Sequence, residues 1–157
     1  MSVTFSIAKE KLLEWNGEPN ICLSPIYPEG FDNTPKIDPE YPEYGELYPD
    51  NPWELNVTNS NAFELLNILG VPQTEYCGTL CGNDLTTIVR IGSECLATLV
   101  AAPELMDMGT PSHESKGSKG CTIIQCGHHP GWYTDRITKI VELATIALAH
   151  DACISFC

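Results

Sequence analysis

Hydrophobic and polar residues alternate near both ends of the chain, with the period of two that is typical of β-strands. In residues 3–7 (VTFSI) every second residue is apolar, and the alternation returns in residues 153–157 (CISFC). A six-residue apolar run, residues 121–126 (CTIIQC), also has the length and composition of a strand. We therefore predict three strands, the first of them followed by a brief polar segment.

Apolar residues three and four positions apart predict a first helix over residues 61–69 (NAFELLNIL). Asn61 and Glu64 have the spacing of a capping box, with Asn in place of Ser or Thr. Gly70, followed closely by Pro72, is expected to end the helix.

Two further segments show helical spacing of apolar residues. The second helix is predicted to begin with Asp84 as its N-cap and to end before Pro103, with Gly92 weakening its middle. The third follows the sequence GHHPGW (127–132) and runs from Tyr133 to about Leu148.

The predicted order is strand, loop, helix, helix, strand, helix, strand. Residues 74–83 and 109–120 are interpreted as loops because they are rich in Gly and polar residues. The unit formed by residues 121–157 has the length of a βαβ crossover, so its two strands could be parallel neighbours. We predict one domain, residues 1–157, of the α+β class or a small α/β sheet, with helices mainly on one face.

Residues 24–54 differ in composition from the rest of the chain. They hold seven of the 12 prolines and four of the six tyrosines, and Lys36 is their only basic residue. Because proline removes backbone donors and restricts the preceding residue, we predict an extended acidic loop. The tyrosines would pin this loop to the body of the protein, which argues against a disordered linker.

The chain has 21 acidic and 8 basic residues, a formal net charge of −13. This balance disfavours direct binding to nucleic acid, which needs clustered Lys and Arg, and it favours solubility or a partner with a basic surface. No apolar run approaches the length of a membrane span, and the first residues lack the pattern of a secretory leader. We therefore expect a cytoplasmic protein without a membrane partner, in the host cell cytoplasm if it is viral.

Three stretches together resemble a family of small uncharacterised proteins of bacteriophages and bacteria. They are NVTNSNAFELLNILGVP, EYCGTL and HHPGWYTDRITKIVELATIALAHDACISFC, so the likeness covers about residues 55–157, with VTFSI in addition. Residues 24–54 have no counterpart in it. The resemblance implies a phage or mobile-element origin, and it implies no established activity.

The GHHPGW turn has two interpretations. In the first, Gly127 turns the chain out of a strand, Pro130 occupies the first helical turn, and His129 or a neighbour caps the helix. In the second, the turn lies between a strand and a helix N-terminus, where anions are favoured. Gly127, His128, His129 and Arg136 would then bind a phosphate or carboxylate.

Eight cysteines raise the question of a metal site or of disulfides. Without a secretory leader we expect reduced, space-filling thiols, with a disulfide framework as the alternative. Zinc is a further alternative, and its best candidate ligands are Cys77, Cys81, His128 and His129, because only this cysteine pair lies on a predicted loop. Otherwise we expect no cofactor. No nucleophile elbow, P-loop or dinucleotide-binding motif is present, so we expect a protein that is not an enzyme.

These features lead to a first hypothesis of a non-enzymatic, intracellular, phage-encoded protein that binds a host or viral protein through its acidic surface. The alternative is a sequestering protein that binds a small anionic ligand or nucleotide signal at the 127–136 turn. A structural component of the virion is the third hypothesis, and homo-oligomerisation remains open.

Overall fold

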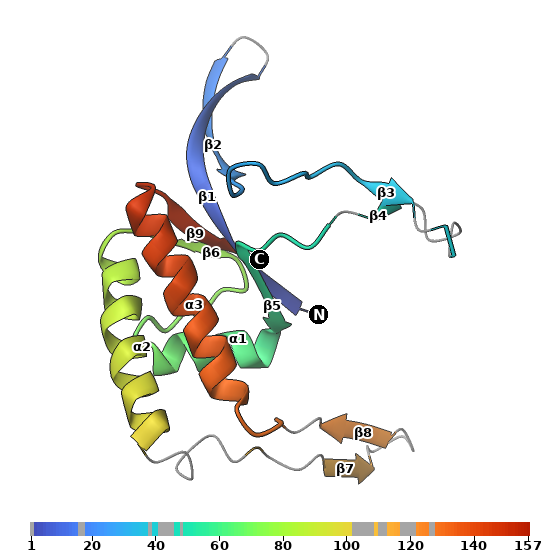
Figure 1. The fold of residues 1–157 in the computed structure, drawn as a ribbon, viewed down its shortest axis with the longest axis vertical. Coiled ribbons are helices and arrows are strands. Elements are labelled where there is room, and N and C mark those ends of the chain that lie inside the picture. Colours follow the sequence, from blue (N-terminus) through green and yellow to red (C-terminus); the bar gives the residue numbers. More distant parts are fainter. Residues whose placement is uncertain are drawn as a thin grey trace.

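The computed structural model describes residues 2–15, 18–37, 39–40, 46–47, 49–101, 109, 113–116, 122–125 and 128–157. Within these residues the protein has an α+β fold, as predicted, in which three helices pack against an antiparallel sheet (Figure 1).

The main sheet is built around its first strand. Strand β1 (Ser2–Trp15) is flanked along one edge by β5 (Glu54–Thr58) and then β2 (Glu18–Pro25), and along the other edge by β9 (Cys153–Phe156). Strand β6 (Gly78–Leu80) pairs with β9, and all of these pairings are antiparallel.

The outer half of β1 and all of β2 form a hairpin that projects from the sheet (Figure 1). Leu12 pairs with Ile21, and about two-thirds of each side chain is exposed. The sequence pattern predicted only the buried inner half, residues 3–7, and interpreted the outer half as a polar segment. The hairpin was missed because residues 9–14 (KEKLLE) lack the alternation of apolar and polar residues that indicates a half-buried strand.

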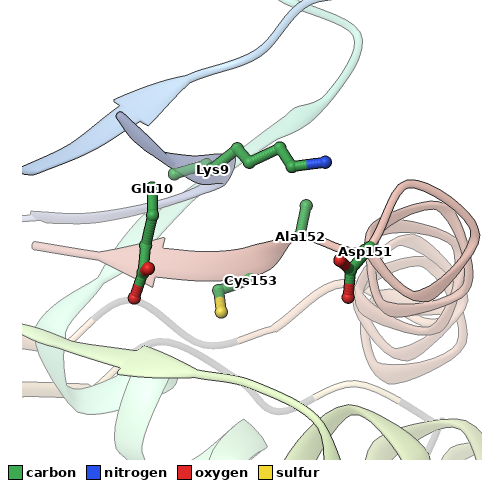
Figure 2. A pocket seen from close by; sticks show the side chains of 6 residues that line it. Lys9, Glu10, Asp151, Ala152 and Cys153 are labelled. Carbon is green, nitrogen blue, oxygen red and sulfur yellow. The ribbon is translucent and has the colours of Figure 1, made fainter. Parts of the chain in front are cut away.

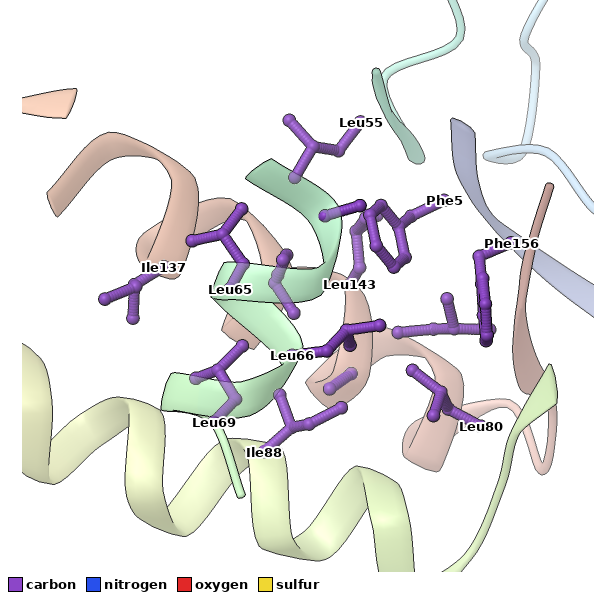
Figure 3. Close-up of a cluster of buried hydrophobic side chains, with 14 of the residues drawn as sticks. Phe5, Leu55, Leu65, Leu66, Leu69, Leu80, Ile88, Ile137, Leu143 and Phe156 are labelled. Carbon is purple, nitrogen blue, oxygen red and sulfur yellow. The ribbon is translucent and has the colours of Figure 1, made fainter. Parts of the chain in front are cut away.

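The helices are α1 (Asn59–Ile68), α2 (Asn83–Ala101) and α3 (Trp132–Ala149). Helices α1 and α3 cover the face of the sheet that presents the apolar alternation of β1, β5 and β9, and α2 packs mainly against α3, so the helices lie on one face as expected. Figure 3 shows Leu66 and Leu143 on the side of Phe5 and Phe156, and Ile88 of α2 beside Leu66 and Leu69 of α1. None of the described helices has the length and apolarity needed to cross a bilayer.

The predicted βαβ crossover is wrong. Strand β8 (Thr122–Gln125) forms within the apolar run 121–126, but it pairs antiparallel with β7 (His113–Lys116) in a separate two-stranded sheet. Strand β9 instead pairs with β1 and β6. The period of two identified these strands but carried no information about their partners.

Two short strands fall within the Pro-rich span 24–54. Strands β3 (Lys36–Ile37) and β4 (Glu46–Leu47) pair with each other in a third small sheet, and the described residues around them are mostly turns and irregular chain. Tyr27 stacks on Phe31 with ring centroids 5.6 Å apart. The other three tyrosines of this span lie outside the described residues, so their pinning role stays a prediction.

Gly92 lies where α2 crosses α3. A Cβ at this position would be 2.3 Å from Cγ2 of Val141 and 3.2 Å from Cδ2 of Leu69. Glycine has a low helix propensity, but at position 92 it permits the close approach of α2 and α3.

We expect Gly92→Ala to lower the free energy of unfolding by about 1–2 kcal/mol. Overpacking costs about 1–3 kcal/mol, and the better helix propensity of alanine offsets up to about 1 kcal/mol. Urea denaturation would measure the change, with Ser93→Ala on the exposed side of α2 as the control. An unchanged or higher stability of Gly92→Ala would show that the crossing tolerates a methyl group.

Candidate functional site

The GHHPGW turn leads into α3 without a side-chain cap. The N-cap residue is Gly131, at φ 84°, which has no side chain to make a capping hydrogen bond, and the Trp132 N–H donates to the backbone oxygen of His129. The N-cap is therefore a neighbour of His129 and not His129 itself, and Pro130 precedes the first turn instead of lying within it. Gly127 lies outside the described residues.

The two histidines of the turn have different surroundings. The His128 ring stacks on the Trp132 indole, with centroids 4.0 Å apart and an interplanar angle of 22°, and it meets Tyr133 edge-on. His129 is exposed, and its Nδ1 lies 2.8 Å from the backbone oxygen of Pro130. His128 thus supports the aromatic start of α3.

Arg136 lines a pocket between the start of α1 and the start of α3. The cavity has a volume of about 240 Å³, and the described residues that line it are Asn56, Val57, Thr58, Asn61, Trp132 and Arg136. Of the four residues predicted to bind an anion, only Arg136 is among them. His128 is adjacent through its stacking on Trp132.

The guanidinium of Arg136 has no partner among the described residues. Its Nε atom is buried without a hydrogen bond, and none of the ion pairs between described residues includes it. The buried Oδ1 of Asn59, in the first turn of α1, also lacks a partner. A partly buried charge without a counter-charge is unfavourable, so the pocket favours an incoming anion.

The N-terminus of α1 adds to this polarity. Its N-cap is Thr58, whose side chain makes no capping hydrogen bond, and no acidic residue lies in its first turn. The positive end of the helix dipole therefore remains uncompensated beside the pocket.

The predicted capping box of Asn61 and Glu64 is wrong, because α1 begins at Asn59 and Glu64 points to another helix. Glu64 Oε1 accepts a hydrogen bond of 2.5 Å from the Tyr133 hydroxyl. Burial, followed by this hydrogen bond, raises the pKa of Tyr133 to about 12. The bond ties α1 to α3 next to the pocket and leaves Asn61 free to line it.

Four cysteines form two disulfides, Cys77–Cys157 and Cys81–Cys153. The pairing of β6 with β9 explains both, because Gly78 lies opposite Phe156 and Leu80 opposite Ile154. One residue beyond these pairs, Cys77 faces Cys157 at one end of the ladder and Cys81 faces Cys153 at the other. Their Cα atoms are 4.1 and 4.6 Å apart, as in directly opposed antiparallel residues.

The disulfides correct the expectation of space-filling thiols, and they occupy the two sulfurs proposed as zinc ligands. Within the described part of the chain, no three His, Cys, Asp or Glu residues are placed to share a metal ion. Cys22 and Cys95 are unpaired, and Cys121 and Cys126 lie outside the described residues. In the sequence, Cys77 and Cys81 have the same spacing as Cys153 and Cys157. This equal spacing was the signal that two disulfides could join one pair of antiparallel strands.

The acidic residues of the span 24–54 are only partly described. The pKa of Asp32 is lowered by hydrogen bonds from Thr34 and, to a smaller extent, by Lys36, which lies 3.7 Å away. Glu43 lies outside the described residues, and the side chain of Glu46 is not described. Whether this span presents one acidic surface to a protein partner stays a prediction.

No known family model matches the chain, and no curated protein or solved structure matches it significantly. The resemblance to small phage and bacterial proteins therefore stays a prediction.

Proposed function

We propose that this protein binds a small anion, or the anionic group of a small molecule, in the pocket between α1 and α3. The observation that carries the proposal is Arg136, which lines the pocket without a hydrogen bond or ion pair to any described residue. Guanidinium groups bind carboxylates and phosphates through paired N–H donors.

The size of the pocket limits its ligand. Its volume of about 240 Å³ is below the range of roughly 300–1,000 Å³ that is usual for drug-sized ligands. A phosphate or carboxylate group fits this space, and a larger molecule would place only its anionic end there. An anionic ligand was also predicted for the 127–136 turn, but of the residues predicted there only Arg136 lines this pocket.

The net charge of −13 does not oppose such a site. Charges further apart than about 8 Å are largely screened at physiological ionic strength, so the ligand responds mainly to groups around the pocket. Those groups are the guanidinium, the amide side chain of Asn61 and the start of α1. The Asn56 amide donates to Thr4 Oγ1, and the nearby Glu64 carboxylate accepts a hydrogen bond from the Tyr133 hydroxyl.

The other sequence-based hypotheses rest on charge and resemblance. Binding of a basic protein through the acidic surface, a phage origin and a role in the virion all stay predictions. So does a cytoplasmic location. Disulfides of cytoplasmic proteins are usually transient and catalytic or redox-sensing. A cytoplasmic location would therefore mean that the two cross-strand bonds are of this kind.

The proposal predicts that Arg136→Gln weakens the binding of inorganic phosphate at least tenfold, since a hydrogen bond to a charged group contributes about 1.5–3 kcal/mol. Titration would be followed by calorimetry and by the NMR shift of the Trp132 indole N–H. Arg136→Lys should bind with intermediate affinity, because it keeps the charge and loses the planar pair of donors.

Arg90→Gln is the matched control. Arg90 is exposed on α2 and pairs with Glu94, so this change alters the net charge equally at a distance from the pocket. Equal phosphate affinities of Arg136→Gln and the unmodified protein would disprove the proposal, as would an absence of saturable phosphate binding to the unmodified protein.

A further inference from the structure

The Cys81–Cys153 disulfide lies on the face of the sheet that the helices leave uncovered. Cys153 follows Ala152 at the start of β9 and pairs with Ala8 of β1. Its neighbours in sequence alternate, so that Ile154 and Phe156 are buried while Cys153 and Ser155 are partly exposed. Cys81 is exposed at the end of β6. A thiol in solution can therefore reach this bond.

A pocket opens beside Cys153 (Figure 2). It has a volume of about 400 Å³ and is lined by Ala8, Lys9, Glu10, Asp151, Ala152 and Cys153. These residues come from β1, from the turn that joins α3 to β9, and from the first residue of β9. In Figure 2, Glu10 and Asp151 lie on either side of Cys153.

The order of the strands gives this pocket a productive geometry for thiol–disulfide exchange. In the order β6–β9–β1, Cys81 lies on one side of Cys153 and the pocket residues Lys9 and Glu10 lie on the other. Figure 2 shows the Cys153 sulfur pointing toward β6. Since the attacking and leaving sulfurs must lie in line with the sulfur under attack, a thiolate in the pocket would attack Cys153 Sγ with Cys81 as the leaving group.

We propose that Cys81–Cys153 is a reactive disulfide that oxidises a dithiol, and that Glu10 and Asp151 select a neutral or positively charged dithiol. One thiolate of the substrate attacks Cys153 Sγ, the bond to Cys81 breaks, and the Cys81 thiolate takes a proton from water. The second substrate thiol then loses its proton and attacks the substrate sulfur of the mixed disulfide. The substrate leaves as a disulfide, having lost two electrons and two protons, and Cys153 is protonated.

Charge provides the selectivity. The pocket has two carboxylates, those of Glu10 and Asp151, against one ammonium group, that of Lys9, which donates to the backbone oxygen of His150. The attacking species is a thiolate, so a substrate with further negative charge is repelled by this net negative charge, while a substrate with an ammonium group is attracted. Glutathione, the abundant thiol of reducing cells, carries a net negative charge and would react slowly. The Cys77–Cys157 bond, four residues further along β6 and β9, keeps the two strands joined while Cys81–Cys153 is open.

The test compares the monothiols cysteamine and thioglycolate as cationic and anionic probes of the folded, oxidised protein. The rate of mixed-disulfide formation is measured by acid quenching, alkylation and peptide mass spectrometry. Each rate is divided by that of the same thiol with the protein unfolded in urea, which removes intrinsic differences between the probes. We expect the corrected rate to be about tenfold higher for cysteamine, with its adduct on Cys153.

Glu10→Gln combined with Asp151→Asn should reduce this ratio to about twofold. Asparagine is well tolerated at position 151, where φ is 49°. Glu142→Gln, an exposed carboxylate of α3 paired with Lys139, should leave the ratio unchanged. The proposal is overturned if the folded protein forms no adduct, if the adduct is on Cys81, or if the double variant keeps the full ratio.

Discussion

Replacing all four bonded cysteines, Cys77, Cys81, Cys153 and Cys157, by serine is expected to lower the free energy of unfolding by about 7 kcal/mol. The two disulfides join residues 80 and 72 positions apart in sequence. In the chain-entropy description, closing either loop alone restricts the unfolded chain by about 4.5 kcal/mol. Because small domains are stable by about 5–15 kcal/mol in total, the quadruple variant should be marginally folded.

The two contributions are not independent, because the smaller loop lies inside the larger one. Once Cys81–Cys153 has formed, Cys77–Cys157 closes a ring of only about ten further residues. That ring contributes about 2.7 kcal/mol. Removing either pair alone should therefore cost about 2.7 kcal/mol, and removing both should cost more than twice that amount.

Urea denaturation at mildly acidic pH, where thiol–disulfide exchange is slow, would measure the two double variants and the quadruple variant. Cys22→Ser is the control, since Cys22 is unpaired in the described structure and half-buried on the projecting hairpin. Strict additivity of the two double variants would contradict the nested-loop account. An unchanged stability of the quadruple variant would mean that the bonds do not form in solution.

The elements that the sequence predicted are those whose burial is local and periodic. The face of α1 that carries Leu65 and Leu66, and the alternation of Ile154 and Phe156 in β9, follow directly from the spacing of apolar residues. The outer hairpin and β6 were not predicted. In the hairpin Leu12, Ile21 and Leu23 are exposed, and β6 has only three residues, of which Leu80 alone is buried hydrophobic.

The candidate site was predictable in part. Arg136 was selected because it lies near a helix N-terminus, which is a local property of the sequence. The other side of the pocket comes from the end of β5 and the start of α1, and only the packing of these elements against α3 brings them to Arg136. Asn61 was assigned to a cap because Glu64 follows at the spacing of a capping box, but Glu64 instead bonds to Tyr133, 69 positions away. A contact at that distance in sequence has no local signature.

Phe156→Ala is expected to lower the free energy of unfolding by about 3–5 kcal/mol. The Phe156 side chain is buried, its ring centroid lies 5.8 Å from that of Phe5, and its edge rests on the backbone of Gly78. Truncation to alanine would leave a cavity between β9, β1 and β6 that the surrounding backbone ladder prevents from closing.

Gly78 provides a matched test of this packing. A Cβ at position 78 would lie 2.6 Å from Cζ of Phe156, so Gly78→Ala alone should cost about 1–3 kcal/mol through overpacking. In the Phe156→Ala background the added methyl enters the cavity left by the ring, and the same change should be neutral or stabilising. The double-mutant cycle should therefore give a coupling of at least about 1 kcal/mol.

Chemical denaturation of the four proteins in the cycle would measure the coupling. Thr79→Ala, on the exposed face of β6, is the control and should be additive with Phe156→Ala. Since Gly78 lies between Cys77 and Cys81, the cycle also tests whether the core face of β6 fixes the position of the strand that carries both disulfides. If Gly78→Ala cost the same in both backgrounds, the ring would not rest on Gly78, and the disulfides alone would hold β6 in register.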